Sequence, residues 1–340
     1  MAVFSASSEI ASSSMRSWSA RGTRLILSLL MASCVESRDE PAPAPTVEGV
    51  RWRSLQPAPK PRTEVAAASD GDRIFVVGGF TETGATVPTV EVFEPEAEAW
   101  SQGPDLPVAV NHAMATALEG TVYVLGGYLG PGLSNPSDRI FALQGERWEE
   151  LAPMPEPRAA GGSAAVDGLL YVAGGVGPDG LAEAVLVFDP EAGRWSTMEG
   201  PPTGREHLGV AGSHGRLFVV GGRTGGIGSN LDVAESYNVA AGRWIGLDDM
   251  PTARGGIAAS ATANGYVVAA GGEADTTFEE VEAYDVETAR WVSLPPLPTP
   301  RHGLGVVALG TVVYVIAGGP QPGLSVSDAA EAIDLAPLRS

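Results

Sequence analysis

Short runs of apolar residues recur along this chain, and each run ends in two adjacent glycines. Ile74-Phe75-Val76-Val77 is one such run. The pairs are Gly78-Gly79, Gly126-Gly127, Gly174-Gly175, Gly221-Gly222, Gly271-Gly272 and Gly318-Gly319, at successive spacings of 48, 48, 47, 50 and 47 residues. Short runs of β-branched and aromatic residues that stop at glycine are typical of buried β-strands. A constant period of about 50 residues indicates a repeat protein of the β-propeller class.

Each repeat predicts four short strands. A small, apolar segment such as residues 64–68 comes first, and a turn joins it to the glycine-ended run. All six turns end in glycine and three of them are Asp-Gly or Asn-Gly, as in Asp70-Gly71, which suits a tight hairpin because such turns need positive φ. The third segment ends in an aromatic and a turn residue, and the fourth opens with a tryptophan. One tryptophan per repeat recurs with the same period of about 50 residues. These tryptophans are Trp52, Trp100, Trp148, Trp195, Trp244 and Trp291.

The two ends of the repeat array predict how it closes. The first copy begins with a fourth segment only, at residues 50–55, and no tryptophan follows Gly318-Gly319. We therefore expect the N-terminal strand to complete the last sheet, because closure removes exposed sheet edges. The expected fold is all-β, a monomeric propeller of six blades over residues 50–340 with four antiparallel strands per blade.

The repeat resembles the kelch repeat. The marks of that family are the double glycine, an aromatic residue a short way on, a tryptophan, and a proline-rich turn that leads to an arginine. Most copies carry all of them in register over about residues 50–336. The resemblance implies a kelch-type propeller, a fold that by itself does not specify a function.

The residues before the repeats predict export. Three arginines and a short apolar run at residues 25–31 precede Ala32-Ser33-Cys34. This order is that of a signal peptide, here residues 1–33, and the apolar run is too short for a stable membrane span. The stretch resembles a bacterial lipoprotein signal, which implies a lipid on Cys34; an ordinary export signal with an incidental cysteine is the alternative. Residues 34–49 are rich in proline and alanine and predict a semi-rigid tether.

The composition of the chain argues against some classes of binding partner. The formal charge is −20 at pH 7, which opposes binding to nucleic acid or to an anionic membrane surface. We expect an exported protein, either a membrane-anchored lipoprotein or a periplasmic or extracellular protein, that touches a membrane only through the anchor. Cys34 is the only cysteine, so neither a disulfide framework nor a thiolate metal site is expected. Four scattered histidines predict no metal and no cofactor, and three near one rim can meet only if the loops bring them together.

The loops after the glycine pairs vary from copy to copy, and function tends to lie in such loops. The start of each innermost strand shares their face, and five copies carry an arginine there. These arginines predict a cationic mouth that grips carboxylates; pairing inside the framework is the alternative. The candidate ligand-binding residues on this rim are Arg62, Asn111, His112, Arg158, Arg205, His207, Arg254, Arg301 and His302. His214 lies in a hairpin turn on the opposite face and is not a candidate.

Two functions remain open. The first is a scaffold that binds a protein or an anionic glycan at the bacterial cell envelope, which needs no catalytic set, and none is visible. The alternative is a sugar-processing enzyme similar to the sialic-acid mutarotases, which are also six-bladed kelch propellers. Its candidates rest on fold analogy alone: Arg62, Glu64, Arg205, Glu206 and His207. The copper oxidases that resemble galactose oxidase use a Tyr–Cys cross-link, which this chain cannot build in its repeats.

Overall fold

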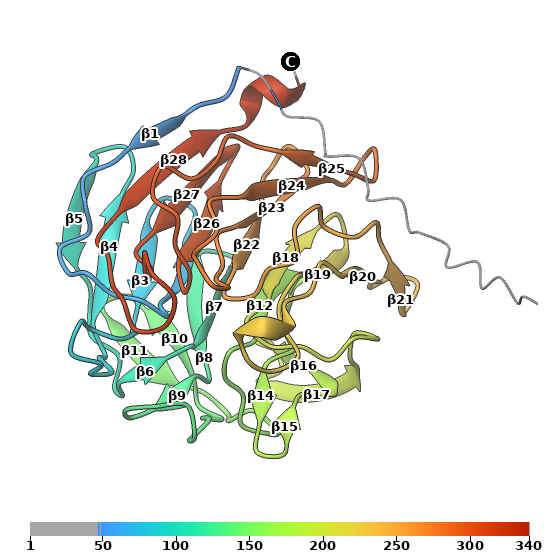
Figure 1. Cartoon of the computed structure of the whole chain (residues 1–340). Coiled ribbons are helices and arrows are strands. Elements are labelled where there is room, and N and C mark those ends of the chain that lie inside the picture. Colours follow the sequence, from blue (N-terminus) through green and yellow to red (C-terminus); the bar gives the residue numbers. More distant parts are fainter. Residues whose placement is uncertain (1–46, 48, 340) are drawn as a thin grey trace, which may run out of the picture. The chain divides into compact units, whose positions relative to one another are not determined.

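The structure is a computed structural model that describes Val47 and residues 49–339, all within one compact unit. Six sheets of four antiparallel strands surround a common axis in this unit (Figure 1). The predicted six-bladed propeller is therefore confirmed. The predicted signal peptide, Cys34 and most of the tether lie outside the described residues. Among the residues described, no helix has the length and apolar character needed to cross a bilayer.

Within blades 1 to 5, the strands lie side by side in chain order, from the innermost strand at the axis to the outermost. Blade 1 contains β2 (Ala66–Ser69), β3 (Ile74–Val77), β4 (Val90–Glu94) and β5 (Ala99–Gln102). Blade 2 contains β7 (Met114–Leu118), β8 (Thr121–Leu125), β10 (Ile140–Gln144) and β11 (Arg147–Glu150). Blade 3 contains β12 (Gly162–Val166), β13 (Leu169–Ala173), β16 (Ala184–Asp189) and β17 (Arg194–Glu199).

The second half of the ring repeats the arrangement. Blade 4 contains β18 (Gly209–Ser213), β19 (Arg216–Val220), β20 (Ala234–Asn238) and β21 (Arg243–Gly246). Blade 5 contains β22 (Ala258–Ala261), β23 (Tyr266–Ala270), β24 (Val281–Asp285) and β25 (Arg290–Ser293). Blade 6 contains β26 (Gly305–Leu309), β27 (Val312–Ile316), β28 (Ala330–Asp334) and β1 (Trp52–Ser54).

Short elements decorate the loops between these strands. Two small ladders form there, and two single turns of 3-10 helix accompany them. The ladders are β6 (Val110–Asn111) with β9 (Tyr128–Leu129) and β14 (Val176–Gly177) with β15 (Gly180–Leu181). The 3-10 turns are η1 (Ile227–Ser229) and η2 (Ala336–Arg339).

The N-terminal strand closes the ring as the ends of the array predict. Strand β1 pairs antiparallel with β28, and Trp52 lies opposite Ile333. The indole N–H of Trp52 also donates to the carbonyl oxygen of Pro295 in blade 5, at 2.8 Å. Blade 6 thus has the same four strands as the others, and its outer edge carries the beginning of the repeat array (Figure 1).

The repeated tryptophans join neighbouring blades. In every blade the indole N–H donates to a backbone carbonyl just beyond the outermost strand, or at its end, in the preceding blade, at 2.7–2.9 Å. The apolar core is divided in the same way, because each large buried cluster contains side chains of two adjacent blades. Most of the hydrophobic stabilisation therefore lies between sheets, which is why single repeats are not expected to fold alone.

The sixth glycine pair is displaced by one residue from its predicted place. Ala317 and Gly318 occupy the positions that Gly78 and Gly79 occupy in blade 1, since the N–H of Ala317 bonds Ala329 just as that of Gly78 bonds Thr89. Ala317 keeps the left-handed backbone of its glycine counterparts, with φ 58°. The last blade therefore tolerates a Cβ where the other five blades have none.

Candidate functional site

Six residues, one from each blade, form a belt around the axial cavity. Each stands just before an innermost strand, and all six have φ between 50° and 73°. In five of the six, the N–H donates to the carbonyl oxygen of the belt residue in the preceding blade at 2.7–3.1 Å, and the N–H of Val65, next to Glu64, closes the circle onto Gly303 at 3.3 Å. The belt residues are Glu64, His112, Ala160, His207, Gly256 and Gly303.

The composition of the belt points to function. A left-handed backbone costs a residue other than glycine about 1–2 kcal/mol, and two blades do use glycine here. Glu64, His112 and His207 nevertheless carry large polar side chains at this position, with φ of 53°, 50° and 51°. Backbone strain of this kind gathers at binding and catalytic sites, so these three residues are the centre of the candidate site.

The five predicted arginines do not form a cationic mouth. Their side chains are 0–1% exposed because they point into the blades and bond the strands from within. Arg62, for example, donates to the carbonyl oxygens of Gly78 and Thr89 at 2.6 and 3.0 Å and to Glu91 Oε2 at 2.8 Å. The carboxylate partners of the five arginines are Glu91, Glu156, Glu235, Glu282 and Glu331. Arg62, Arg158, Arg205, Arg254 and Arg301 therefore hold the framework, which is the alternative that the sequence left open.

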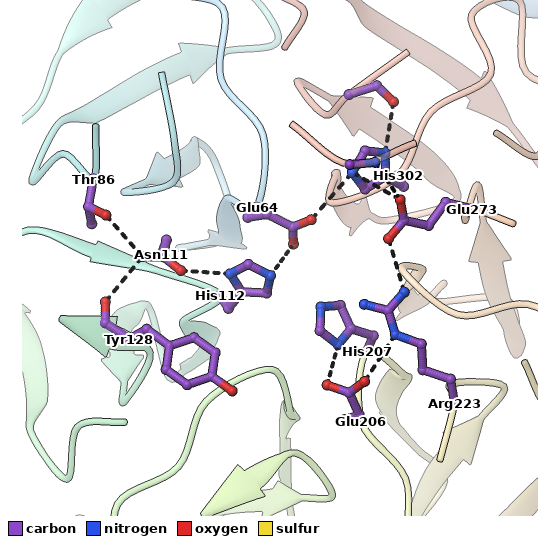
Figure 2. A network of polar contacts seen from close by, with 12 residues as sticks. Glu64, Thr86, Asn111, His112, Tyr128, Glu206, His207, Arg223, Glu273 and His302 are labelled. Atoms are coloured by element: carbon purple, nitrogen blue, oxygen red, sulfur yellow. Dashed lines mark hydrogen bonds and ion pairs between the residues drawn. The ribbon is translucent and has the colours of Figure 1, made fainter. Parts of the chain in front are cut away.

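A polar ring takes the place of the expected arginines at the mouth of the cavity. Glu64 is its hub: Oε2 lies 3.1 Å from Nε2 of His112, and Oε1 lies 3.5 Å from Nε2 of His302. His302 Nε2 also lies 3.5 Å from Oε2 of Glu273. These side chains come from four blades, and Figure 2 shows them converging.

The ring continues through blades 4 and 5. Arg223 bridges two carboxylates, with 3.0 Å to Glu273 Oε1 and 3.0 Å to Glu206 Oε1. Glu206 Oε2 in turn lies 2.7 Å from Nδ1 of His207. The rings of His207 and His112 then meet edge to face with 4.9 Å between centroids, so the contacts return to their starting point (Figure 2). Blade 3 adds only the small apolar Ala160 to the belt.

Hydrogen bonds determine which nitrogen of each histidine carries its hydrogen. Asn111 Nδ2 donates to Thr86 Oγ1 and Gly130 O, at 3.0 and 3.2 Å, so its Oδ1 is the atom that faces Nδ1 of His112 at 2.7 Å. That Nδ1 must therefore donate. The same logic applies to His207 and His302.

Nδ1 of His207 faces Glu206 Oε2 at 2.7 Å, and Nδ1 of His302 faces Gly319 O at 3.1 Å. The carbonyl oxygen of Gly319 and the ionised carboxylate of Glu206 can only accept hydrogen bonds, so Nδ1 of each histidine donates. Burial acts to raise the pKa of Glu206, but His207 and Arg223 outweigh it and hold this pKa below its usual value. In all three histidines Nε2 is thus the atom turned toward the centre of the site, with its lone pair exposed when the ring is neutral.

The charges at the centre are strongly coupled. Burial acts to raise the pKa of Glu64, but His112, His302, His207 and Arg223 outweigh it and lower this pKa to about 2. Burial lowers the pKa of His112 to about 4, against the opposing effect of Glu64. At neutral pH the carboxylate of Glu64 is therefore ionised.

The structure brings together a set of potential metal-ligating atoms that lie far apart in the sequence. One ligand atom each from Glu64, His112 and His207 lies within 4.8 Å of the other two. The same three side chains line a cavity of about 110 Å³ on the axis. Two histidines and one carboxylate are a donor set that zinc sites use.

The sequence predicted part of this site. His112, His207, His302 and Asn111 do meet at the mouth, whereas His214 lies in the turn between β18 and β19, on the opposite face. Of the enzyme candidates, Glu64, Glu206 and His207 come together, but Arg62 and Arg205 do not join them. Arg223 and Glu273 were missed. Their signal is positional: both directly follow a glycine pair, where the equivalent residues of blades 1 and 2 are Phe80 and Tyr128.

Comparisons with known proteins agree with the repeat. Residues 46–200 match the family model described as the KLHDC2/KLHL20/DRC7 Kelch-repeats domain, and residues 204–251 and 258–298 match the Kelch motif. A curated relative, the Kelch-like protein terF of Aspergillus terreus, is 28% identical over 233 residues, which is 63% of this chain and 50% of the relative. The chain thus matches about half the length of that relative.

Proposed function

This chain belongs to the kelch-repeat β-propellers, and from that premise we propose that it is a protein-binding scaffold held at the bacterial cell envelope. Kelch propellers generally bind proteins, and the loops that differ between copies here share one face. The proposed binding surface is that loop face, and the proposed anchor is a lipid on Cys34.

Exposed apolar side chains on the loop face carry the proposal. Among the described residues, the exposed large hydrophobic side chains are Leu133 and Leu324, at 54% and 57% exposure. Leu133 lies in the loop between β8 and β10, and Leu324 in the loop between β27 and β28, so both are on the face of the polar ring. A protein partner that docks on this face would bury these apolar side chains, and that burial would favour association.

Side-chain contacts tie the loops that carry these leucines. Thr277 Oγ1 in blade 5 donates to Pro320 O in blade 6 at 3.1 Å. Thr86 Oγ1 in blade 1 donates to Gly130 O in blade 2 at 2.6 Å. Loops fixed in this way lose less conformational entropy on binding than free loops, which favours a preformed surface.

A protein partner is favoured over an anionic glycan. The glycan proposal needed arginines free to grip carboxylates, and those five side chains are buried with glutamates. The mutarotase-like alternative used two of these arginines, Arg62 and Arg205, which are buried as well, and no observation favours it. An acidic protein partner is disfavoured as well, because this chain carries a formal charge of −20.

The test of the binding face uses the full-length chain as bait in a bacterial envelope extract. Replacing both leucines, Leu133→Asp and Leu324→Asp, should remove the specifically captured proteins. Ala97→Asp is the matched control, because Ala97 is exposed in the loop between β4 and β5 on the opposite face. Capture that survives the double replacement, or that Ala97→Asp abolishes equally, contradicts the proposed face.

The anchor has its own test. Cys34→Ser should move the protein from the membrane pellet to the soluble fraction and abolish incorporation of labelled fatty acid. Membrane association that persists in Cys34→Ser contradicts lipidation, and it does so without affecting the binding-face result.

A further inference from the structure

We propose that Glu64, His112 and His207 bind a divalent transition-metal ion of the zinc class at the centre of the belt. Neither the repeat nor the proposed scaffold function requires a metal. The inference rests on the position of the donor atoms at the cavity, on the hydrogen bonds that orient the two imidazole rings, and on the acidic side chains around them.

The hydrogen bonds of His112 turn its Nε2 toward Glu64. Its Nδ1 donates to Asn111 Oδ1 at 2.7 Å, and its Nε2 lies 3.1 Å from Glu64 Oε2. The amide orientation of Asn111 fixes this arrangement of the ring. An imidazole nitrogen and a carboxylate oxygen, two kinds of atom that bind zinc, therefore lie side by side.

The polar ring contains more carboxylates than guanidinium groups. Its three glutamates are Glu64, Glu206 and Glu273, and its arginine is Arg223, so its formal charge apart from the histidines is −2. All four side chains are at most 12% exposed. Buried charge without a counterion is costly, and a bound divalent cation would offset it.

The donor atoms are oriented as metal ligands are. Histidines that bind metals usually donate their other N–H to a carboxylate or carbonyl oxygen, which fixes the ring. Asn111 Oδ1 does this for His112, and Glu206 Oε2 does it for His207. His302 Nε2 lies 3.5 Å from the other oxygen of Glu64.

The spacing requires a small inward movement. A tetrahedral zinc ion with bonds of about 2.0–2.1 Å places its ligand atoms roughly 3.3 Å apart. The Glu64–His112 pair already has 3.1 Å, and all three atoms lie within 4.8 Å of one another. Binding of the ion therefore requires the more widely spaced of these atoms to close toward that separation.

The fourth position faces the axial cavity. The three ligand residues line that cavity of about 110 Å³, which leaves room for water beside the ion. Three protein ligands with an open position are the arrangement of reactive, exchangeable zinc sites rather than closed structural ones. Two imidazoles and one carboxylate favour zinc and its transition-metal neighbours over Mg²⁺ and Ca²⁺, which prefer oxygen ligands.

The test is metal binding to the full-length chain, purified without a histidine tag and stripped with a chelator. Titration calorimetry with Zn²⁺ alone should show one ion per chain, and Co²⁺ should give the visible absorption of a four- or five-coordinate site without a thiolate band. His112→Asn, His207→Asn and Glu64→Gln should each weaken Zn²⁺ binding by about 100-fold or more, beyond the 10–100-fold of a second-shell change. Asparagine suits the two histidine positions because it tolerates the left-handed backbone.

His214→Asn is the matched control. His214 is an exposed histidine with the same left-handed backbone, φ 51°, and its replacement should leave Zn²⁺ affinity unchanged. The melting temperature of each stripped variant reports whether it is folded. If a histidine variant does not fold, Glu64→Gln and the Co²⁺ spectrum of the unmodified chain still decide the outcome. A folded chain that takes up no Zn²⁺, or one that binds it equally in all three ligand variants, overturns the proposal.

Discussion

Arg62 and Glu91 form an ion pair in the interior of blade 1, with 2.8 Å between Nη2 and Oε2 and both side chains 1% exposed. Blade 2 has neither residue. Val110 takes the place of the arginine, and Phe141, opposite Val124 as Glu91 is opposite Val76, takes that of the glutamate. The two apolar side chains lie in the same buried cluster. Blades 1 and 2 thus fill equivalent interior positions in two ways, with an ion pair in blade 1 and with two apolar side chains in blade 2.

This contrast predicts a non-additive pair of mutations. Glu91→Leu alone leaves a buried guanidinium without its carboxylate and should lower the free energy of unfolding by about 3–5 kcal/mol. Arg62→Val with Glu91→Phe, which copies blade 2, should cost clearly less than the single replacement. Chemical denaturation of the three proteins measures this, and a double variant less stable than Glu91→Leu contradicts the reading of blade 2.

Removal of the closing strand should open the ring. Deletion of residues 50–56 eliminates β1 and exposes the edge of β28, so we expect the melting temperature to fall by about 10 °C or more, with aggregation through the free edge. Trp52→Phe is the graded control, because it keeps the strand and an aromatic ring and removes the hydrogen bond to Pro295, which contributes about 1 kcal/mol, together with part of the indole's packing. An unchanged melting temperature after the deletion contradicts closure through β1.

Ala317 is a strained position that glycine should relieve. Its φ of 58° is left-handed, and the equivalent residues of the other blades are glycines. Ala317→Gly should therefore raise the free energy of unfolding by up to about 1 kcal/mol.

The reverse change in blade 1 gives the matched comparison for Ala317. Gly78→Ala should destabilise, because a Cβ there would lie 2.4 Å from the carbonyl oxygen of Val110. Thermal unfolding of the two variants measures whether Ala317→Gly stabilises the protein and Gly78→Ala destabilises it. A loss of stability in Ala317→Gly would show that the alanine methyl group packs more favourably than its backbone is strained.

The β2–β3 turn predicts a pH dependence in acid. Burial acts to raise the pKa of Asp70, but the N–H groups of Arg73 and Asp72 and the Arg73 side chain outweigh it and lower this pKa below 3.8. Because the folded-state value is the lower one, the stabilisation is fully present above the unfolded pKa. It is lost as the pH falls through the folded value.

Asp70→Asn should accordingly cost less than about 1 kcal/mol at neutral pH, as expected for a partly exposed group. The difference from the unmodified chain should shrink below pH 3.8. Urea midpoints at several pH values measure it. A difference that stays constant down to strongly acid pH contradicts the assignment of the effect to the Asp70 charge.

The strands, the blade number and the ring closure follow from the sequence because their signals are local and repeated. Runs such as Ile74–Val77 carry the strand pattern within a few residues, and the left-handed glycines that end them recur in register. A mistake in one copy, such as the displacement at Gly318-Gly319, does not disturb the other five. The missing fourth segment at the end of the array likewise identifies its partner at the start.

The site could be predicted only in part, because its members are assembled by the ring. Aligning the copies on the arginine shows Glu64, His112 and His207 in one column, but not which way their side chains point. The arginines illustrate the same limit. Whether Arg62 faces solvent or the blade interior depends on its partner Glu91, which lies on β4, two strands after the innermost strand β2 that Arg62 precedes.

The amino-acid sequence by itself determined a closed ring of six kelch blades, because strand, turn and repeat signals act over short distances along the chain. Only the tertiary structure decided that five arginines are buried and that two histidines and a glutamate from separate blades converge on the axis. Convergence requires the whole ring to close, since each blade supplies at most one belt residue and its neighbours hold that residue in place through the backbone.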